Sequence, residues 1–538
     1  MSTQLTHKYP EIKAGHSEQV TKAAGIVGFF TFLSRILGLI RDMVIAALFG
    51  SGMMADAFFV AFRIPNLLRR LFAEGSLTIA FIPIFSEYLN KKSKADALEL
   101  ARVTLTILSL ILVCVSVAGV LLAPWIVRIQ AFGFGSTGSK YELTVLLTRI
   151  TFPYIFLISI VAFFMGVLNS LKHFGAPAAA PIFLNVGIIA GAVFISPRLD
   201  EPIVGVAIGV IIGGILQVFL QLPWIKKEGM VLWPKWNPSH PAVKRIGVLM
   251  LPAVFGSAVY QLNQFIGTLL ASFLPEGSIS WLYYADRLVQ FPLGIFGIAI
   301  STAALPTLSE HAALDKLSEF SETLSHSLRM VFFITFPAMA GLVVLGAPIV
   351  KLIYQRGAFD LHAASMTYRA LAFYSIGLWA FSGIRIMVSA FYALQDTKTP
   401  VIVASCALFL NLFFSLLFMG PMKHAGLALA LSCASGIQFA LLVVALRHKL
   451  PGVSFSGVMS CAFKSLLASA IMGGGLFVVQ NKWGLAYAAR GPAYLFVDVA
   501  VLVSLGAISY FGIAALMRSR ELRSLIDMFS LKRRKTSL

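Results

Sequence analysis

Long apolar runs alternate with short polar segments along almost the whole chain. A run of about 20 apolar residues is enough for a helix to cross the hydrocarbon layer of a bilayer, whereas an outer-membrane barrel shows short alternating segments. The pattern therefore predicts an all-α polytopic membrane protein with fourteen transmembrane helices, the second of which continues as an amphipathic helix near 76–90. The predicted helices lie at 23–49, 54–88, 102–130, 143–170, 178–197, 202–224, 243–273, 279–309, 328–350, 366–394, 400–420, 425–447, 457–480 and 494–517.

The composition agrees with this interpretation. Hydrophobic residues make up 58% of the chain, charged residues only 12%, and the mean hydropathy is +0.86. Soluble domains are nearer 45–50% apolar and about 25% charged. These values exclude a soluble globular enzyme, a disordered chain and a fibrous protein.

The net charge of +20 is spread along the chain. It is not gathered on one aromatic-rich domain, so it does not indicate nucleic acid binding. Lys and Arg concentrate instead in 89–101, 225–245, 447–452 and the tail after 517. Because cytoplasmic loops collect basic residues, both termini are predicted in the cytoplasm, in agreement with an even number of spans.

An internal repeat divides the predicted helices. FIPIFSE at 81–87 matches ALPTLSE at 304–310, and LKHFGAP at 171–177 matches LQDTKTP at 394–400, both 223 positions apart. Two parallel six-helix repeats are therefore expected around a central cavity, followed by two extra C-terminal helices, with alternating access by rocking as the mechanism. The expected segments are 1–22 (cytoplasmic), 23–224 (N-lobe), 225–242 (linker), 243–449 (C-lobe), 450–517 (helices 13 and 14) and 518–538 (basic tail).

Charged residues inside the spans gather on predicted helices 1, 2 and 8. An ionisable residue in a span is costly unless it faces a partner or water, so it marks a candidate site. Arginine dominates, and its planar fork suits phosphate oxygens, which indicates an anionic, phosphate-bearing substrate. Internal pairing or snorkelling is the alternative explanation, above all for Arg63, Arg69 and Arg70. The candidate substrate-binding residues are Arg35, Arg41, Asp42, Asp56, Arg69, Arg70, Glu74, Asp286, Arg287 and Gln290.

Three stretches carry a family resemblance: SRILGLIRD at 34–42, ADAFFVAFRIPNLLRRLFAEG at 55–75 and SWLYYADRLVQFP at 280–292. With the fourteen-helix plan, they resemble the MurJ (MviN) family of bacterial lipid II flippases. That family belongs to the multidrug/oligosaccharidyl-lipid/polysaccharide exporter superfamily. The resemblance extends over about 23–517.

The resemblance implies transport of lipid II, the undecaprenyl-diphosphate-linked disaccharide-pentapeptide, from the inner to the outer leaflet of the bacterial cytoplasmic membrane for peptidoglycan synthesis. It implies that arginines matching Arg35, Arg41, Arg69 and Arg287 line the cavity. It also implicates acids matching Asp42, Asp56 and Asp286, and it assigns helices 13 and 14 to a groove for the lipid tail.

Two departures from the family pattern stand out. Gln290 occupies a position where some relatives have an acid. Predicted helix 7 has no Asp or Glu and carries only Tyr260, Gln261, Asn263 and Gln264 as polar groups near its middle. A sodium site built on carboxylates of this helix is therefore not expected, and membrane potential is the simpler driving force for an anionic headgroup.

Other functions stay open as alternatives. These are a flippase for another polyprenyl-diphosphate-linked glycan, a cation-coupled drug exporter, and a membrane enzyme acting on polyprenyl phosphates. The enzyme is disfavoured because the chain has no DxD, HExxH or GxSxG motif. No cofactor or metal is expected. The expected partners are lipid II, membrane lipids and the cell-wall synthesis machinery, and a single chain with two repeats suffices for transport.

Overall fold

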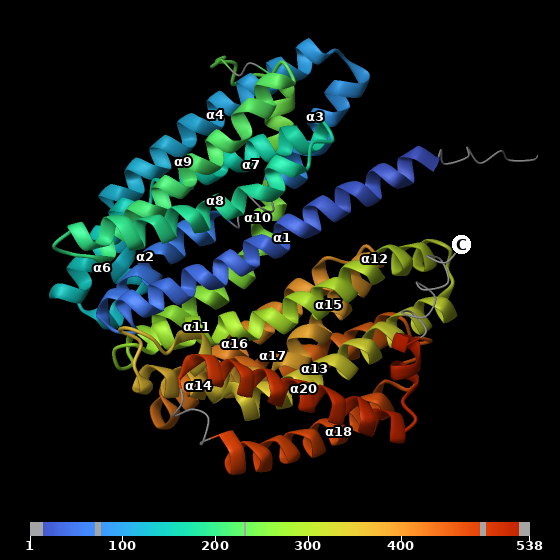
Figure 1. Cartoon of the computed structure of the whole chain (residues 1–538). Helices are drawn as coiled ribbons and strands as arrows, with labels where there is room; N and C mark the ends of the chain where they lie inside the picture. Colours follow the sequence, from blue (N-terminus) through green and yellow to red (C-terminus); the bar gives the residue numbers. More distant parts are fainter. Residues whose placement is uncertain (1–13, 70–76, 231–232, 485–490, 527–538) are drawn as a thin grey trace, which may run out of the picture. The chain divides into compact units, whose positions relative to one another are not determined.

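The computed structural model describes residues 14–69, 77–230, 233–484 and 491–526. Over these residues the backbone is helical, with turns between the helices and no β-strand (Figure 1). The all-α prediction is therefore confirmed for this part of the chain. The chain divides into two compact units: unit 1 is Met1–Val44, Ala61–Pro124 and Val145–Ser257, and unit 2 is Ile45–Val60, Trp125–Thr144 and Ala258–Leu538.

Each of the fourteen predicted runs carries helix, although residues 70–76 of the second run lie outside the described residues. Within the described residues, ten helices are long and apolar enough to cross a membrane. The number rises to eleven if the bent pair α14 (Leu361–Ile376) and α15 (Leu378–Ala393) is one span. The number of fourteen crossings stays a prediction.

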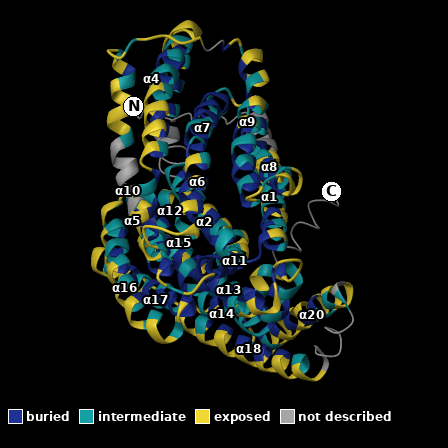
Figure 2. Ribbon diagram, turned by 90° about the vertical axis from the view of Figure 1, so that its left-hand side faces the viewer, coloured by how far each residue is buried: buried dark blue, intermediate teal, exposed yellow. Residues whose placement is uncertain are grey.

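Unit 1 is a bundle that includes most of α1 (Ala14–Phe49), α3 (Leu77–Lys91) and α4 (Lys94–Leu121), followed by α7 (Tyr154–Ser170), α8 (Gly175–Ala190) and α9 (Ile203–Lys227). Its core is aromatic: the Phe81 ring stacks on Phe85 and meets Phe163. The side chains of α4 that point away from this core are exposed, as expected for a surface that meets lipid (Figure 2).

The pair α8 and α9 packs backbone to backbone. A Cβ on Gly187 would collide with the backbone of Gly213, and one on Gly191 would collide with the carbonyl oxygen of Gly205. Small residues are favoured at such positions because apolar helices in a bilayer associate mainly through close van der Waals packing. These glycines let two helices of the N-terminal half approach closely.

Unit 2 contains α11 (Ser278–Pro292), α12 (Ile298–Ala313), α13 (Leu317–Tyr354), α14, α15, α16 (Lys398–Met422), α17 (His424–Lys449), α18 (Val458–Val479) and α20 (Pro492–Leu516). Its core gathers Phe320, Phe332 and Phe391, and a second cluster around Phe333 and Tyr510 joins α18 and α20 to α13. The unit also holds the end of α1, where the Ala358 N–H donates to the Ala47 carbonyl at 2.8 Å.

Five of the described helices contribute residues to both units. They are α1, α2 (Met53–Leu68), α5 (Ala123–Gln130), α6 (Ser139–Thr151) and α10 (Pro241–Ser272). The charged residues predicted on helices 1, 2 and 8 therefore divide between the units: those of α1 up to position 44 lie in unit 1, while Asp56 of α2 lies with α11 in unit 2.

Two turns 223 positions apart have the same geometry. After α7, Lys172 is left-handed (φ 62°), and the His173 N–H donates to the Leu168 carbonyl at 2.8 Å. After α15, Gln395 is left-handed (φ 56°), and the Asp396 N–H donates to the Phe391 carbonyl at 2.9 Å. In both turns, the N–H of the second residue after the C-cap donates to a carbonyl of the last helical turn and so closes the helix C-terminus.

Candidate functional site

A buried ion pair lies on α1 in unit 1. The Arg41 guanidinium donates through Nε and Nη2 to Asp42 Oδ1, at 3.0 and 2.7 Å. Its Nη1 donates to Asn185 Oδ1 of α8 at 3.0 Å, and Asn185 Nδ2 donates to the Ser34 carbonyl at 3.1 Å. Arg41 and Asp42 are 8% and 1% exposed. The planar cation is thus held by charge-assisted bonds in one orientation.

Arg35 lies on the same helix, about 1.7 turns before Arg41, and its side chain is exposed. Arg41 is therefore oriented by its neighbours, whereas Arg35 keeps an accessible cationic end. The Arg41 side chain is thus fixed in orientation, and the Arg35 side chain on the same helix is exposed.

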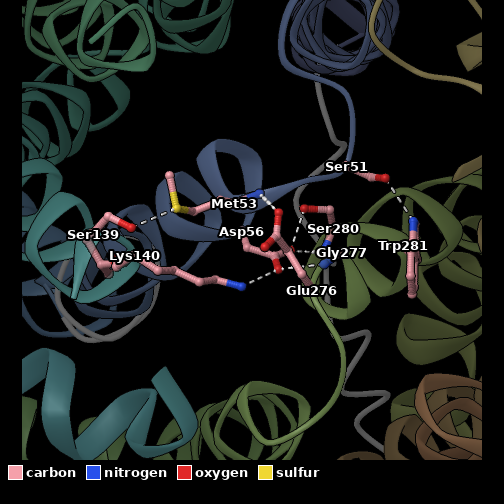
Figure 3. Close-up of polar contacts among 10 residues, drawn as sticks. Ser51, Met53, Asp56, Ser139, Lys140, Glu276, Gly277, Ser280 and Trp281 are labelled. Atoms are coloured by element: carbon pink, nitrogen blue, oxygen red, sulfur yellow. Dashed lines mark hydrogen bonds and ion pairs between the residues drawn. The ribbon is translucent and has the colours of Figure 1, made fainter. Parts of the chain in front are cut away.

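A second network joins α2, α6 and α11 in unit 2 (Figure 3). Asp56 of α2 is 1% exposed and pairs with Lys140 Nζ of α6 at 2.8 Å. The same carboxylate accepts the N–H groups of Gly277 at 2.8 Å and Ser280 at 2.9 Å, and the Ser280 hydroxyl at 2.7 Å. Both oxygens of Asp56 are therefore bound to donors of the protein.

The Asp56 contacts have a clear physical cause. Gly277 is the N-cap residue of α11 and has no side chain to satisfy the first N–H groups of that helix. Asp56 takes over this role from α2, and its negative charge also meets the positive end of the α11 dipole. Glu276 does the same for α2, because its carboxylate accepts the Met53 N–H at 2.6 Å.

The polar residues of α11 form a separate patch. Gln290 Nε2 donates to Asp286 Oδ1 at 3.3 Å, one turn apart. Arg287 Nη2 donates to the Tyr283 hydroxyl at 2.8 Å, with the guanidinium 4.9 Å from the Tyr283 ring centre. The Tyr283 ring in turn stacks on Phe59 of α2, with centroids 3.9 Å apart. The polar side chains of this patch are half-buried. Arg287 lies against the Tyr283 ring, which stacks on Phe59, so aromatic rings from α11 and α2 support it.

Directly after α2, Arg69 Nε donates to Oδ1 of Asn66, in the last turn of that helix, at 3.0 Å. The predicted site residues Arg70 and Glu74 lie outside the described residues. Of the candidate residues on predicted helix 2, only Asp56 and Arg69 are therefore described, and Asp56 is buried in the contact with α11.

The structure brings in four residues that the sequence reasoning did not select: Lys140, Asn185, Glu276 and Ser280. Two signals in the sequence could have found Asn185 and Glu276. Asn185 is an isolated amide in an otherwise apolar run, and Glu276-Gly277-Ser278 has the composition of a helix start. Lys140 gave no such signal, because it stands in a polar loop segment where an exposed lysine is ordinary.

Within the described ranges, no group of three or more His, Cys, Asp and Glu side chains gathers in a way that could hold a metal ion. On α10, the amide of Asn263 accepts a hydrogen bond from Asn411 Nδ2 of α16 at 2.8 Å. A neutral amide pair thus occupies this contact between α10 and α16.

The fold is that of a known class of membrane transporters. A multidrug resistance MATE family transporter of the MOP superfamily, in an inward-facing conformation, aligns with 81% of this chain and 99% of its own, with a TM-score of 0.67 and 13% identity. A structure described as lipid II flippase MurJ in an inward closed conformation aligns with 93% of this chain and 99% of its own, with a TM-score of 0.78 and 27% identity.

The sequence comparisons are more specific. The family model described as lipid II flippase MurJ matches residues 45–490. The probable lipid II flippase MurJ of Vibrio cholerae is 39% identical over 528 residues, 94% of this chain and 97% of its own. The lipid II flippase MurJ of Burkholderia cenocepacia is 42% identical over 428 residues, 79% of this chain and 83% of its own. The chain therefore belongs to the MurJ family of lipid II flippases, and it is a multi-pass membrane protein.

Proposed function

We propose that this protein moves lipid II from the inner to the outer leaflet of the bacterial inner membrane, as a transporter and not as an enzyme. The observation that carries the proposal is the match to lipid II flippases over nearly the full length of both chains. The buried, oriented arginine on α1 supports it, because a diphosphate needs forked cations that do not depend on solvent for their position.

Alternating access between two parallel six-helix repeats is the proposed mechanism. The turns at Lys172 and Gln395 support the repeat. In both, a residue with left-handed backbone conformation is followed by the same kind of closing hydrogen bond, and the two turns are 223 positions apart. We further propose fourteen spans with both termini in the cytoplasm, because the basic segments then fall on one side. One chain holds both repeats, so a single copy suffices; docking to the cell-wall synthesis machinery is part of the proposal.

The diphosphate is proposed to bind the arginines of predicted helices 1, 2 and 8: Arg35, Arg41, Arg69, Arg70 and Arg287. Arg41 offers a preset cation, because Asp42 and Asn185 fix its plane. Arg287 is positioned on the Tyr283 ring. The other candidate residues, Asp42, Asp56, Glu74, Asp286 and Gln290, are proposed to belong to the same substrate site; Asp42 also orients Arg41, and Asp56 also caps α11.

Membrane potential is the proposed driving force. The diphosphate is anionic and the cell interior is negative, so outward movement gains about 2.3 kcal/mol per charge per 100 mV if the charge crosses the whole field. The α10–α16 contact offers neutral amides at Asn263 and Asn411 in place of carboxylates, which agrees with a mechanism that needs no cation there.

Exposure of lipid II on the outer leaflet tests the proposal. The chain would be the only flippase in a depletion strain, and Arg41→Ala and Arg287→Ala would be compared with Lys91→Ala, whose side chain is 76% exposed. Lipid II exposure with wild type and control but not with the arginine variants, at equal membrane levels, is expected. Lack of exposure with well-expressed wild type would contradict the assignment and favour another polyprenyl-diphosphate-linked glycan. Unchanged exposure after collapse of the potential would contradict the driving force.

A further inference from the structure

Residues 233–240, before α10, are held against α4 within unit 1. The Lys235 N–H donates to Thr106 Oγ1 at 2.9 Å, and Lys235 Nζ pairs with Glu99 Oε1 at 2.6 Å. Farther on, Arg245 Nη1 pairs with Glu87 Oε2 of α3 at 2.9 Å. These contacts fix the position of residues 233–240 along the axes of α3 and α4.

Residues 233–240 contact α4 where its charged first part ends and its apolar part begins. The first two turns carry the charges, up to Arg102, while residues 103–122 contain no charged side chain. Twenty helical residues span about 30 Å, which matches the hydrocarbon thickness of a bilayer. Thr106 stands about one turn inside this stretch, and farther along the apolar stretch Leu110 and Ile111 are 51% and 55% exposed, as lipid-facing residues are. The Lys235 contacts therefore hold the segment at the boundary between hydrocarbon and water.

Two large aromatic side chains project from the segment at this boundary. Trp233 and Trp236 are 71% and 62% exposed, and Trp224 at the end of α9 is 41% exposed. Tryptophan concentrates at membrane interfaces, because its ring is apolar while its N–H can bond to headgroups or water. Exposed lysines lie near these tryptophans in the sequence, and Lys227 Nζ is 5.7 Å from the centre of the Trp224 ring. They give the surface a charge opposite to that of an anionic leaflet. They are Lys226, Lys227 and Lys244.

We propose that the segment 233–240 is an interfacial anchor: Trp233 and Trp236 insert among the headgroups of an anionic leaflet and, through Lys235, fix the depth of unit 1 in the bilayer. The occupant of this surface is the lipid headgroup layer. The assignment to the cytoplasmic leaflet rests on the proposed orientation of the chain, whereas the insertion itself does not.

Tryptophan fluorescence of the full-length protein in vesicles of phosphatidylethanolamine and phosphatidylglycerol tests the anchor. The vesicles would contain phosphatidylcholine that carries a spin-label quencher at a shallow or a deep acyl position. The emission lost in a Trp233→Phe/Trp236→Phe double variant reports the two rings. We expect that difference emission to be quenched strongly by the shallow label and weakly by the deep one. Asn237→Ala, in the same segment, should behave as wild type.

Difference emission that neither label quenches would overturn the proposal, because the rings would then lie in water or under another protein. A double variant with a lower melting temperature in detergent, where no leaflet exists, would also contradict it by assigning the rings to packing. The side of the membrane is tested separately, by labelling Asn237→Cys with an impermeant maleimide. Labelling in intact cells above that of the wild type, whose own Cys114 and Cys406 are exposed, would refute the orientation in the proposed function while leaving the anchor in place.

Discussion

The Glu276 carboxylate accepts the backbone N–H of Met53 at 2.6 Å, and these two residues stand 223 positions apart, the spacing of the sequence repeat. Asp56 returns the contact from α2 to α11 by accepting the N–H groups of Gly277 and Ser280. The two helices thus cap each other: Glu276, just before α11, caps the start of α2, and Asp56, in the first turn of α2, caps the start of α11. The exchange joins α2 and α11, the two helices that the predicted repeat places in equivalent positions.

The Asp56 cap predicts a stability effect. Asp56→Asn removes the charge that Lys140 and the α11 N-terminus share, so the free energy of unfolding should fall by about 1–3 kcal/mol. Lys140→Met should cost less alone, because the backbone donors still hold Asp56. Thermal unfolding of purified protein in detergent measures both effects. Strictly additive losses in the double variant would show that Asp56 and Lys140 are not coupled.

Arg41 is expected to act through the shape of its guanidinium. Arg41→Lys keeps the charge but loses the fork that contacts Asp42 and Asn185, so lipid II exposure should fall by about tenfold or more. Asn185→Leu should cause a smaller loss, because it releases one end of the fork while the Asp42 pair remains. Exposure assays at matched membrane levels check this order. Full activity of Arg41→Lys would mean that only charge matters at this position.

The α8–α9 contact should not tolerate a side chain. Gly187→Ala places a Cβ against the backbone of Gly213, so a loss of about 1–3 kcal/mol in the free energy of unfolding is expected. Gly247→Ala of α10 is the matched control, because a Cβ there meets nothing within 4 Å. Helix propensity should make the control neutral or slightly stabilising. Equal melting temperatures for both variants would argue against tight α8–α9 packing.

Asp396, in the loop between α15 and α16, predicts a pH dependence. Burial raises the pKa of this carboxyl, but hydrogen bonds from Lys449 and Thr399 outweigh it and leave the pKa well below its ordinary value. A lowered folded-state pKa contributes stability that is present above pH ~4, near the unfolded value, and is lost as pH falls through the folded-state value. Wild type should therefore lose melting temperature on acidification.

Asp396→Asn should lower the melting temperature at neutral pH by an amount that corresponds to about 1–3 kcal/mol, and its difference from wild type should shrink in acid. Asp360→Asn is a useful comparison, because the Asp360 carboxylate caps α14 by accepting a hydrogen bond from the Ala363 N–H. A difference between wild type and Asp396→Asn that stays constant down to strongly acidic pH would contradict the ion-pair interpretation.

The sequence by itself determined the helical class, the position of the helices and the family. Apolar runs of membrane length admit few structures other than helices, because backbone groups in lipid must bond within their own segment. The sequence also predicted a repeat, and LKHFGAP and LQDTKTP, which share a Leu and a Pro at the same spacing, cover the two similar turns after α7 and α15. The concentration of charge on α1, α2 and α11 was readable because ionisable residues are rare in such runs.

Only the tertiary structure decided which partners those charges have. Asp56 was indistinguishable in sequence from a substrate-binding acid, yet it is buried against the start of α11 and Lys140, 84 positions away. Asn185 similarly becomes the support of Arg41 because α8 passes beside α1. Hydrophobic spacing specifies that a helix forms and which face is apolar. The polar partner of a buried charge depends on which helices meet, and long-range packing settles that.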